Sequence, residues 1–104
     1  MNKYCIITTT CHTLENAEEI TSRLINSNLV CSIQSHPVLS IYKWDEDGDG
    51  FNEIVLTIYT KTSLYKDVEK CILDNHSSKT PQIIQIPIIN GYAGYLEHID
   101  EETI

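Results

Sequence analysis

The chain has 104 residues, 41% of them hydrophobic, so residues 1–104 are expected to form a single domain with one core. Its 15 acidic residues outnumber its 7 basic ones, and the formal net charge is -8. A protein with a negative net charge is poorly suited to neutralising phosphates, so we expect neither nucleic acid nor a membrane surface among its partners. The start of the chain lacks a signal-peptide core, and no apolar run reaches the ~20 residues of a membrane span. These features predict a cytoplasmic protein.

The first half of the chain predicts a strand, a helix and a long extended segment. Residues 3–10 are rich in β-branched and aromatic side chains, which is typical of a strand. Thr13 is placed to cap an amphipathic helix, in which apolar residues recur every three or four positions. Residues 30–44 hold few helix signals, and Pro37 excludes a helix interior. We expect an extended segment there that bends or breaks near His36 and Pro37.

The second half predicts two more strands around another helix. In residues 51–61, apolar side chains occur in both alternating sets of positions, which favours a strand with both faces partly covered. Ser63 can then cap a helix that runs to about Asn75. Residues 83–88 are apolar and include Pro87, which cannot donate to a sheet ladder, so we expect this strand at an edge.

The order of these elements is β-α-β-β-α-β, followed by a short helix around residues 95–99. This order is the split β-α-β, or ferredoxin-like, arrangement of the α+β class, in which one antiparallel sheet carries both main helices on one face. The other face would also carry apolar side chains. Association into a closed symmetric assembly is the natural way to cover it.

An acidic run between two predicted strands resembles the start of a calcium-binding EF-hand loop. It contains three alternating aspartates, Asp45, Asp47 and Asp49. An EF-hand needs a helix on each side and a glutamate at its twelfth position, which here is Leu56. We therefore expect no calcium site but a hairpin tip, with Gly48 and Gly50 supplying the positive φ that such turns require.

One end of the predicted fold collects residues that can bind a transition metal. The first strand and the second helix run in the same direction, so Cys11, His12 and His76 fall at one pole, together with the hairpin tip. Thiolate and imidazole are ligands for copper or zinc, so a joint site is a hypothesis. Taken singly, Cys11 can equally be a buried apolar residue, His12 a solvated loop residue and His76 a residue favoured by the helix dipole. The four cysteines form no C-x-x-C pair, and we expect mostly buried, reduced thiols.

Three runs, "SIYKW", "EIVLTIYTKT" and "KTPQIIQIPIINGYAGYLEHI", resemble the CutA divalent-cation tolerance proteins. The resemblance covers about residues 6–99. It is carried by Tyr42, Trp44, Lys61, Thr62, His76, Pro81, Ile83, Pro87, Tyr95 and Leu96. It implies a homotrimer of ferredoxin-like subunits, related in architecture to the PII signalling proteins and linked to tolerance of copper and other divalent metals.

The resemblance also implies roles for particular residues. The family's copper ligands are a Cys at the end of the first strand and two adjacent His at the end of the second helix, and these positions fall here at Thr9 and at Asn75 with His76. Lys61 and Thr62 occupy the family's strand-to-helix junction. There, either Thr62 or Ser63 caps the helix, or Lys61 holds an anionic ligand between subunits.

Three aromatic residues complete the predicted ligand-binding or interface set. Tyr42 and Trp44 are expected to pack, for instance against a neighbouring subunit, and Tyr95 belongs to the same set.

The sequence favours a protein that is not an enzyme. It contains no nucleophile elbow, no glycine-rich phosphate loop and no His-x-x-x-His zinc pattern. Two functions remain open. The first is a trimeric protein of metal binding or tolerance, with copper or another divalent ion that is not needed for folding. The alternative is a PII-like regulatory or scaffold protein that binds a small anion or a partner protein in clefts between subunits.

Overall fold

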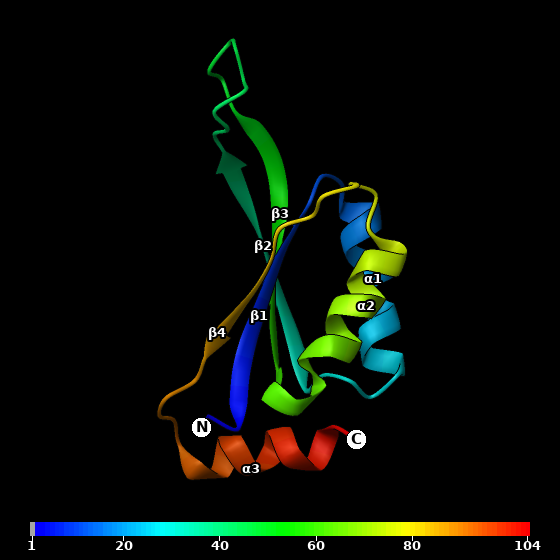
Figure 1. The fold of residues 1–104 in the computed structure, drawn as a ribbon, viewed down its shortest axis with the longest axis vertical. Coiled ribbons are helices and arrows are strands. Elements are labelled where there is room, and N and C mark those ends of the chain that lie inside the picture. Colours follow the sequence, from blue (N-terminus) through cyan, green and yellow to red (C-terminus); the bar gives the residue numbers. More distant parts are fainter. Residues whose placement is uncertain (1) are drawn as a thin grey trace.

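The computed structural model describes residues 2–104 and contains one four-stranded sheet, in the order β2-β3-β1-β4, with every neighbouring pair antiparallel. The elements are β1 (Tyr4–Cys11), α1 (Leu14–Asn26), β2 (Ser32–Ser40), β3 (Phe51–Lys61), the 3-10 turn η1 (Thr62–Leu64), α2 (Tyr65–Asn75), β4 (Ile83–Pro87) and α3 (Ala93–Glu102). Helices α1 and α2 lie on the same side of the sheet, and α3 crosses below its lower end (Figure 1). The predicted α+β order is confirmed.

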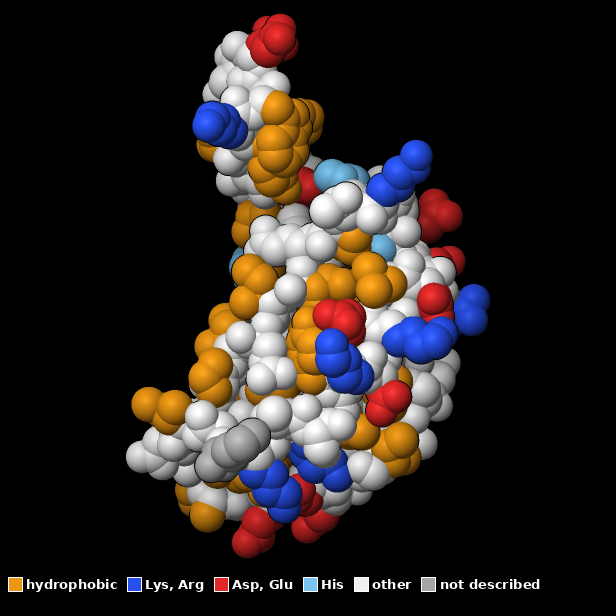
Figure 2. Space-filling model, in the orientation of Figure 1, with side chains coloured by type: hydrophobic (Ala, Val, Ile, Leu, Met, Phe, Trp, Pro, Cys, Tyr) orange, Lys and Arg blue, Asp and Glu red, His pale blue; other side chains and the backbone are white. Residues whose placement is uncertain are grey.

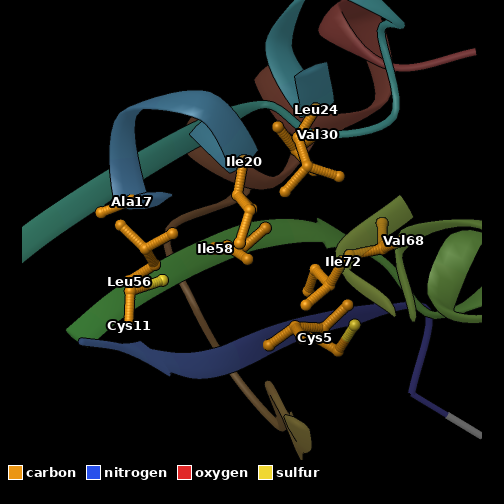
Figure 3. Close-up of a cluster of buried hydrophobic side chains, with 11 residues drawn as sticks. Cys5, Cys11, Ala17, Ile20, Leu24, Val30, Leu56, Ile58, Val68 and Ile72 are labelled. Atoms are coloured by element: carbon orange, nitrogen blue, oxygen red, sulfur yellow. The ribbon is translucent and has the colours of Figure 1, made fainter. Parts of the chain in front are cut away.

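The core lies between the sheet and the two long helices (Figure 3). Alternate residues of the central strands point toward the helices, because successive side chains of a strand face opposite sides. The fully buried aliphatic side chains are Ile7, Ile20, Leu24, Leu56, Ile58, Val68 and Ile72, with Ile99 of α3. Burying each such side chain stabilises the fold by about 1.5–3 kcal/mol.

The opposite side of the sheet also carries apolar residues, which we call the open sheet face. Its members are Ile6, Thr8, Val55, Thr57, Ile84 and Ile86, which share one face through their pairing across β1, β3 and β4. Ile84 and Ile86 of the edge strand remain 47% and 46% exposed. Figure 2 shows hydrophobic side chains along this margin of the body.

Strand β2 differs from the prediction in two ways. The expected break near His36 and Pro37 is wrong, because β2 runs unbroken and pairs Pro37 with Ile54. Proline is tolerated there because β2 is an edge strand, where one side of the backbone needs no ladder partner. The strand also ends at Ser40 rather than Trp44, so residues 41–50 form a long connection that projects beyond the body (Figure 1).

The projecting connection confirms the predicted hairpin. Gly48 and Gly50 adopt φ angles of 70° and 82°, in the left-handed region that glycine occupies most readily. The carboxylate of Asp45 accepts a hydrogen bond from the Gly50 backbone N–H at 2.8 Å. One of the three aspartates of the acidic run therefore closes the turn itself.

The two long helices begin differently. Thr13 caps α1 as predicted, since its hydroxyl oxygen accepts the Asn16 backbone N–H at 3.1 Å. The predicted cap of α2 by Thr62 or Ser63 is wrong, because η1 lies between β3 and α2 and places Leu64 at the cap position, with no side-chain hydrogen bond. The Thr62 N–H instead donates to the Lys3 carbonyl at 2.8 Å.

Two further findings concern the chain as a whole. Cys5 and Cys11 are buried thiols, while Cys31 and Cys71 are half-buried, and all four are free. Among the helices of residues 2–104, none combines the length and apolar character needed to cross a membrane.

Candidate functional site

A cleft of about 630 Å³ lies where the projecting hairpin meets the body, at the pole predicted to hold the metal site. We call it the hairpin cleft. The cleft is lined by His12, Tyr42, Trp44, Phe51, Glu53 and His76, together with Ser78, Thr80 and Gln82. Figure 2 shows histidine side chains at this junction of hairpin and body. The structure therefore brings together four of the predicted site residues: His12, Tyr42, Trp44 and His76.

Aromatic rings form the hairpin side of the cleft. Tyr42 and Trp44 stack with ring centroids 4.4 Å apart, and the ring of Phe51 lies 5.8 Å from that of Tyr42. Trp44 nevertheless remains 71% exposed. Its predicted contact with a neighbouring subunit stays a prediction, and the exposed ring is available for it.

A buried carboxylate, Glu53, stands at the base of the cleft. Its side chain is only 1% exposed, and the Tyr42 hydroxyl donates to its Oε1 at 2.5 Å. The Nδ1 atom of His12 lies 2.7 Å from Oε2. Within residues 2–104 no well-aligned hydrogen-bond donor reaches Oε2, so the close His12 contact does not have hydrogen-bond geometry. Burial raises the pKa of Glu53, but hydrogen bonds from Tyr42 and Ser40 and the proximity of His12 outweigh it, and the pKa lies below its ordinary value.

The sequence prediction missed Glu53. One signal could have found it, since Glu53 is the only acidic residue in the otherwise largely apolar strand β3. An acidic side chain in such a strand requires partners when it is buried.

His76 connects the end of α2 to the end of β1. Its Nε2 lies 2.8 Å from the Thr10 carbonyl oxygen, and its Nδ1 lies 2.9 Å from the Ser78 backbone nitrogen. A carbonyl only accepts and a backbone N–H only donates, so these contacts require a neutral ring protonated at Nε2. Both ring nitrogens of His76 are thus engaged within the chain.

Comparison with known proteins decides the family. The family model of the CutA1 divalent ion tolerance protein matches residues 5–102. The chain belongs to the CutA1 family. A divalent-cation tolerance protein CutA from Archaeoglobus fulgidus is 30% identical over 92 residues, covering 88% of this chain and 90% of that protein.

Two other relatives bear on fold and length. The crystal structure of CutA1 from Shewanella sp. SIB1 has 29% identity and a TM-score of 0.91, covering 98% of this chain and 96% of that one. The chloroplastic protein CutA of Arabidopsis thaliana is 26% identical over 86% of this chain but only 50% of its own length, so this chain spans about half of that protein.

Thr9 and Asn75 occupy positions where the resemblance implies copper ligands, but their side chains do not line the hairpin cleft. Thr9 is fully buried on the helix side of the sheet. The Asn75 side-chain amide donates to the Cys71 carbonyl at 2.8 Å. Cys11 is fully buried in the core and does not line the cleft, and burial together with the charge of Glu53 raises its pKa to about 11.

The predicted three-ligand set is therefore only partly assembled. The structure brings His12 and His76 to one cleft and leaves Cys11 in the core, where it is a protonated thiol at neutral pH. Within residues 2–104, no three His, Cys, Asp or Glu side chains converge tightly enough to enclose an ion alone. The donors that do face the cleft are imidazoles and a carboxylate, which suit zinc or copper(II).

The remaining predicted residues of this CutA1 chain lie at the opposite end of the sheet. Lys61 pairs with Tyr4 in the β1–β3 register, and its ammonium donates to the Ile104 carbonyl at 2.7 Å. The Tyr95 hydroxyl lies 3.3 Å from the Ser32 hydroxyl, and its ring meets that of Tyr59 edge-on. Lys61, Thr62 and Tyr95 thus do not join the hairpin cleft.

The His76 contacts lead to a stability prediction. We expect His76→Ala to lower the free energy of unfolding by about 1–3 kcal/mol, because the Thr10 carbonyl and the Ser78 N–H both lose their partner. The control is His98→Ala, since His98 is half-exposed and lies 4.0 Å from Glu102, and it should change stability by less than about 0.5 kcal/mol. Denaturant unfolding at fixed protein concentration measures both. Equal, small losses would contradict the structural role of His76.

Proposed function

We propose that this protein serves divalent-cation tolerance by binding a zinc-like or copper-like ion in the hairpin cleft, as a cytoplasmic homotrimer that catalyses no reaction. Membership of the CutA1 divalent ion tolerance family supports the tolerance role. The location is supported by the presence of two imidazoles, those of His12 and His76, in the lining of one cleft that also includes the buried carboxylate of Glu53.

The chemistry of the cleft supports a borderline divalent ion rather than calcium. Imidazole nitrogen suits zinc, copper and nickel, whereas calcium selects sets of six to eight oxygens. His12 and His76 would hold the ion, which would supply positive charge beside Glu53. His76 can take part only after it gives up its contact with Thr10 or with Ser78.

The open sheet face supports the homotrimer. It presents a continuous set of aliphatic and threonine side chains that the helices do not cover. An exposed apolar surface of this kind is commonly buried against copies of the same chain. By its resemblance to CutA proteins, this chain is expected to bury it between three subunits related by a threefold axis.

A zinc and copper titration tests the proposal. Wild-type protein, purified without an affinity tag, is titrated with Zn²⁺ and with Cu²⁺ by calorimetry, beside the double variant His12→Ala/His76→Ala. We expect saturable binding to the wild type and loss of most of it in the double variant. Cys11→Ala is the matched control and should bind like the wild type, because its thiol lies outside the cleft. Wild-type protein that binds neither ion would overturn the proposed function.

A further inference from the structure

The charges around the hairpin cleft favour a cationic ligand. Among residues 2–104, the cleft lining contains one acidic side chain, that of Glu53, and no lysine or arginine. The whole chain has a formal net charge of -8. A cleft that combines a carboxylate with apolar walls concentrates the electrostatic field and attracts ions of the opposite sign. An organic cation therefore fits this cleft better than an anion.

One oxygen of Glu53 lacks a hydrogen-bond donor. The Tyr42 hydroxyl donates to Oε1 at 2.5 Å, whereas no aligned donor within residues 2–104 reaches Oε2. The Glu53 side chain is only 1% exposed. A buried carboxylate oxygen without a donor is unfavourable, and most buried polar atoms of folded proteins have a partner. Oε2 is therefore an acceptor that can take an N–H from a ligand.

The route to this oxygen passes the ring of His12. The His12 Nδ1 atom lies 2.7 Å from Oε2, and the His12 side chain is 54% exposed while that of Glu53 is buried. A ligand reaches Oε2 when the His12 ring turns aside. The close contact does not have hydrogen-bond geometry, so no aligned bond to Glu53 holds the ring in place. Rotamer changes of exposed side chains take only picoseconds to nanoseconds.

The aromatic rings of the hairpin supply a wall for the rest of the ligand. Tyr42 and Trp44 stack with centroids 4.4 Å apart, and Trp44 and Phe51 remain 71% and 44% exposed. Figure 2 shows hydrophobic side chains on the hairpin next to histidine side chains of the body. The face of an aromatic ring attracts organic cations, and tryptophan does so most strongly. The cleft volume of about 630 Å³ is typical of small-molecule sites.

We infer that the hairpin cleft binds a small primary ammonium compound, whose N–H groups donate to Glu53 Oε2 and whose apolar body packs against Trp44 and Phe51. A primary ammonium group supplies both a positive charge and three donors, whereas a quaternary ammonium group supplies the charge alone. This inference goes beyond the proposed function, because it concerns a different class of ligand. The ammonium compound and a metal ion would compete for the same cleft.

Three probes that share one ring separate charge from hydrogen bonding. Benzylammonium has both, benzyltrimethylammonium has only the charge, and benzyl alcohol has only a neutral donor. Trp44 is the only tryptophan of the chain, so its indole N–H signal in proton–nitrogen NMR spectra reports occupancy of the cleft. We expect saturable shifts with benzylammonium and binding at least about 10-fold weaker for the other two. Benzyl alcohol that binds as tightly as benzylammonium, or a wild type that binds no benzylammonium, would overturn the inference.

Two glutamate variants test the acceptor. Glu53→Gln should weaken benzylammonium binding by about 10–100-fold, because the ligand loses a charged acceptor. Glu46→Gln removes the same charge from an exposed position of the hairpin outside the cleft lining, and it should bind within about twofold of the wild type. Equal losses in both variants would mean that net charge alone attracts the ligand, which contradicts the inference. Should Glu53→Gln not fold, the probe series and the His12 variant still decide.

His12→Ala distinguishes this inference from the proposed function. Without the imidazole the route to Oε2 is open, so the variant should bind benzylammonium at least as tightly as the wild type, while its zinc binding weakens. If it loses benzylammonium and zinc together, the inference fails and the proposed function stands. If the wild type binds benzylammonium but neither zinc nor copper, the proposed function fails and the inference stands.

Discussion

Replacing Ile84 and Ile86 together by lysine should convert the proposed homotrimer into monomers, with a mass one third of that of the trimer. Both side chains lie on the open sheet face of the edge strand β4 and are about half exposed in the single chain. Burying an isoleucine between subunits contributes about 1.5–3 kcal/mol, whereas an unpaired buried ammonium is strongly unfavourable. The double substitution therefore removes a favourable contact and adds a repulsive one in every copy.

Light scattering at micromolar concentration measures this effect, and Gln85→Lys is its control. Gln85 stands between the two isoleucines but faces the opposite side of the strand, where it pairs with Ile7. The same charge should leave the proposed trimer intact there. A wild-type protein that is already monomeric would contradict the proposed assembly, and a double variant that remains trimeric would show that another surface holds it together.

The second large effect concerns the core between α2 and the sheet. Ile72→Ala should lower the free energy of unfolding by about 2–5 kcal/mol, because Ile72 is fully buried and its loss leaves a cavity among packed neighbours. Leu73 follows it on the same helix but is 52% exposed. Leu73→Ala should therefore cost less than about 1 kcal/mol.

Urea unfolding followed by circular dichroism compares the two alanine variants at equal protein concentration. Because both substitutions delete aliphatic groups from neighbouring positions of one helix, helix propensity largely cancels between them. A Leu73→Ala loss as large as that of Ile72→Ala would mean that another subunit covers the outer side of α2.

The sequence predicted local structure correctly where that structure depends only on residues of the same helix or strand. Thr13 caps α1 because a threonine hydroxyl at that position reaches a free backbone N–H whatever the rest of the fold does. The expectation for Pro37 failed for the opposite reason. Whether a proline breaks a strand depends on which strands pair beside it, and the edge position of β2 is a property of the sheet.

The candidate site was predicted at the level of its location rather than its contacts. Topology correctly brought His12, His76 and the hairpin to one pole. It could not show that Cys11 points into the core while the hydrogen bonds of His76 use both of its nitrogens. Glu53 was missed because alternation alone places it on the sheet side without helices, where an acidic residue usually meets water.

The open sheet face makes the stability of the fold depend on protein concentration if it is buried only by association. If chains must meet before that surface is satisfied, folding and assembly form one equilibrium, and its midpoint depends on how many chains share the solution. Dilution then lowers the stability of the folded protein. The protein is therefore less stable in a cell where its concentration is low than in one where it is high. A melting temperature for such a protein has a defined meaning only at a stated concentration.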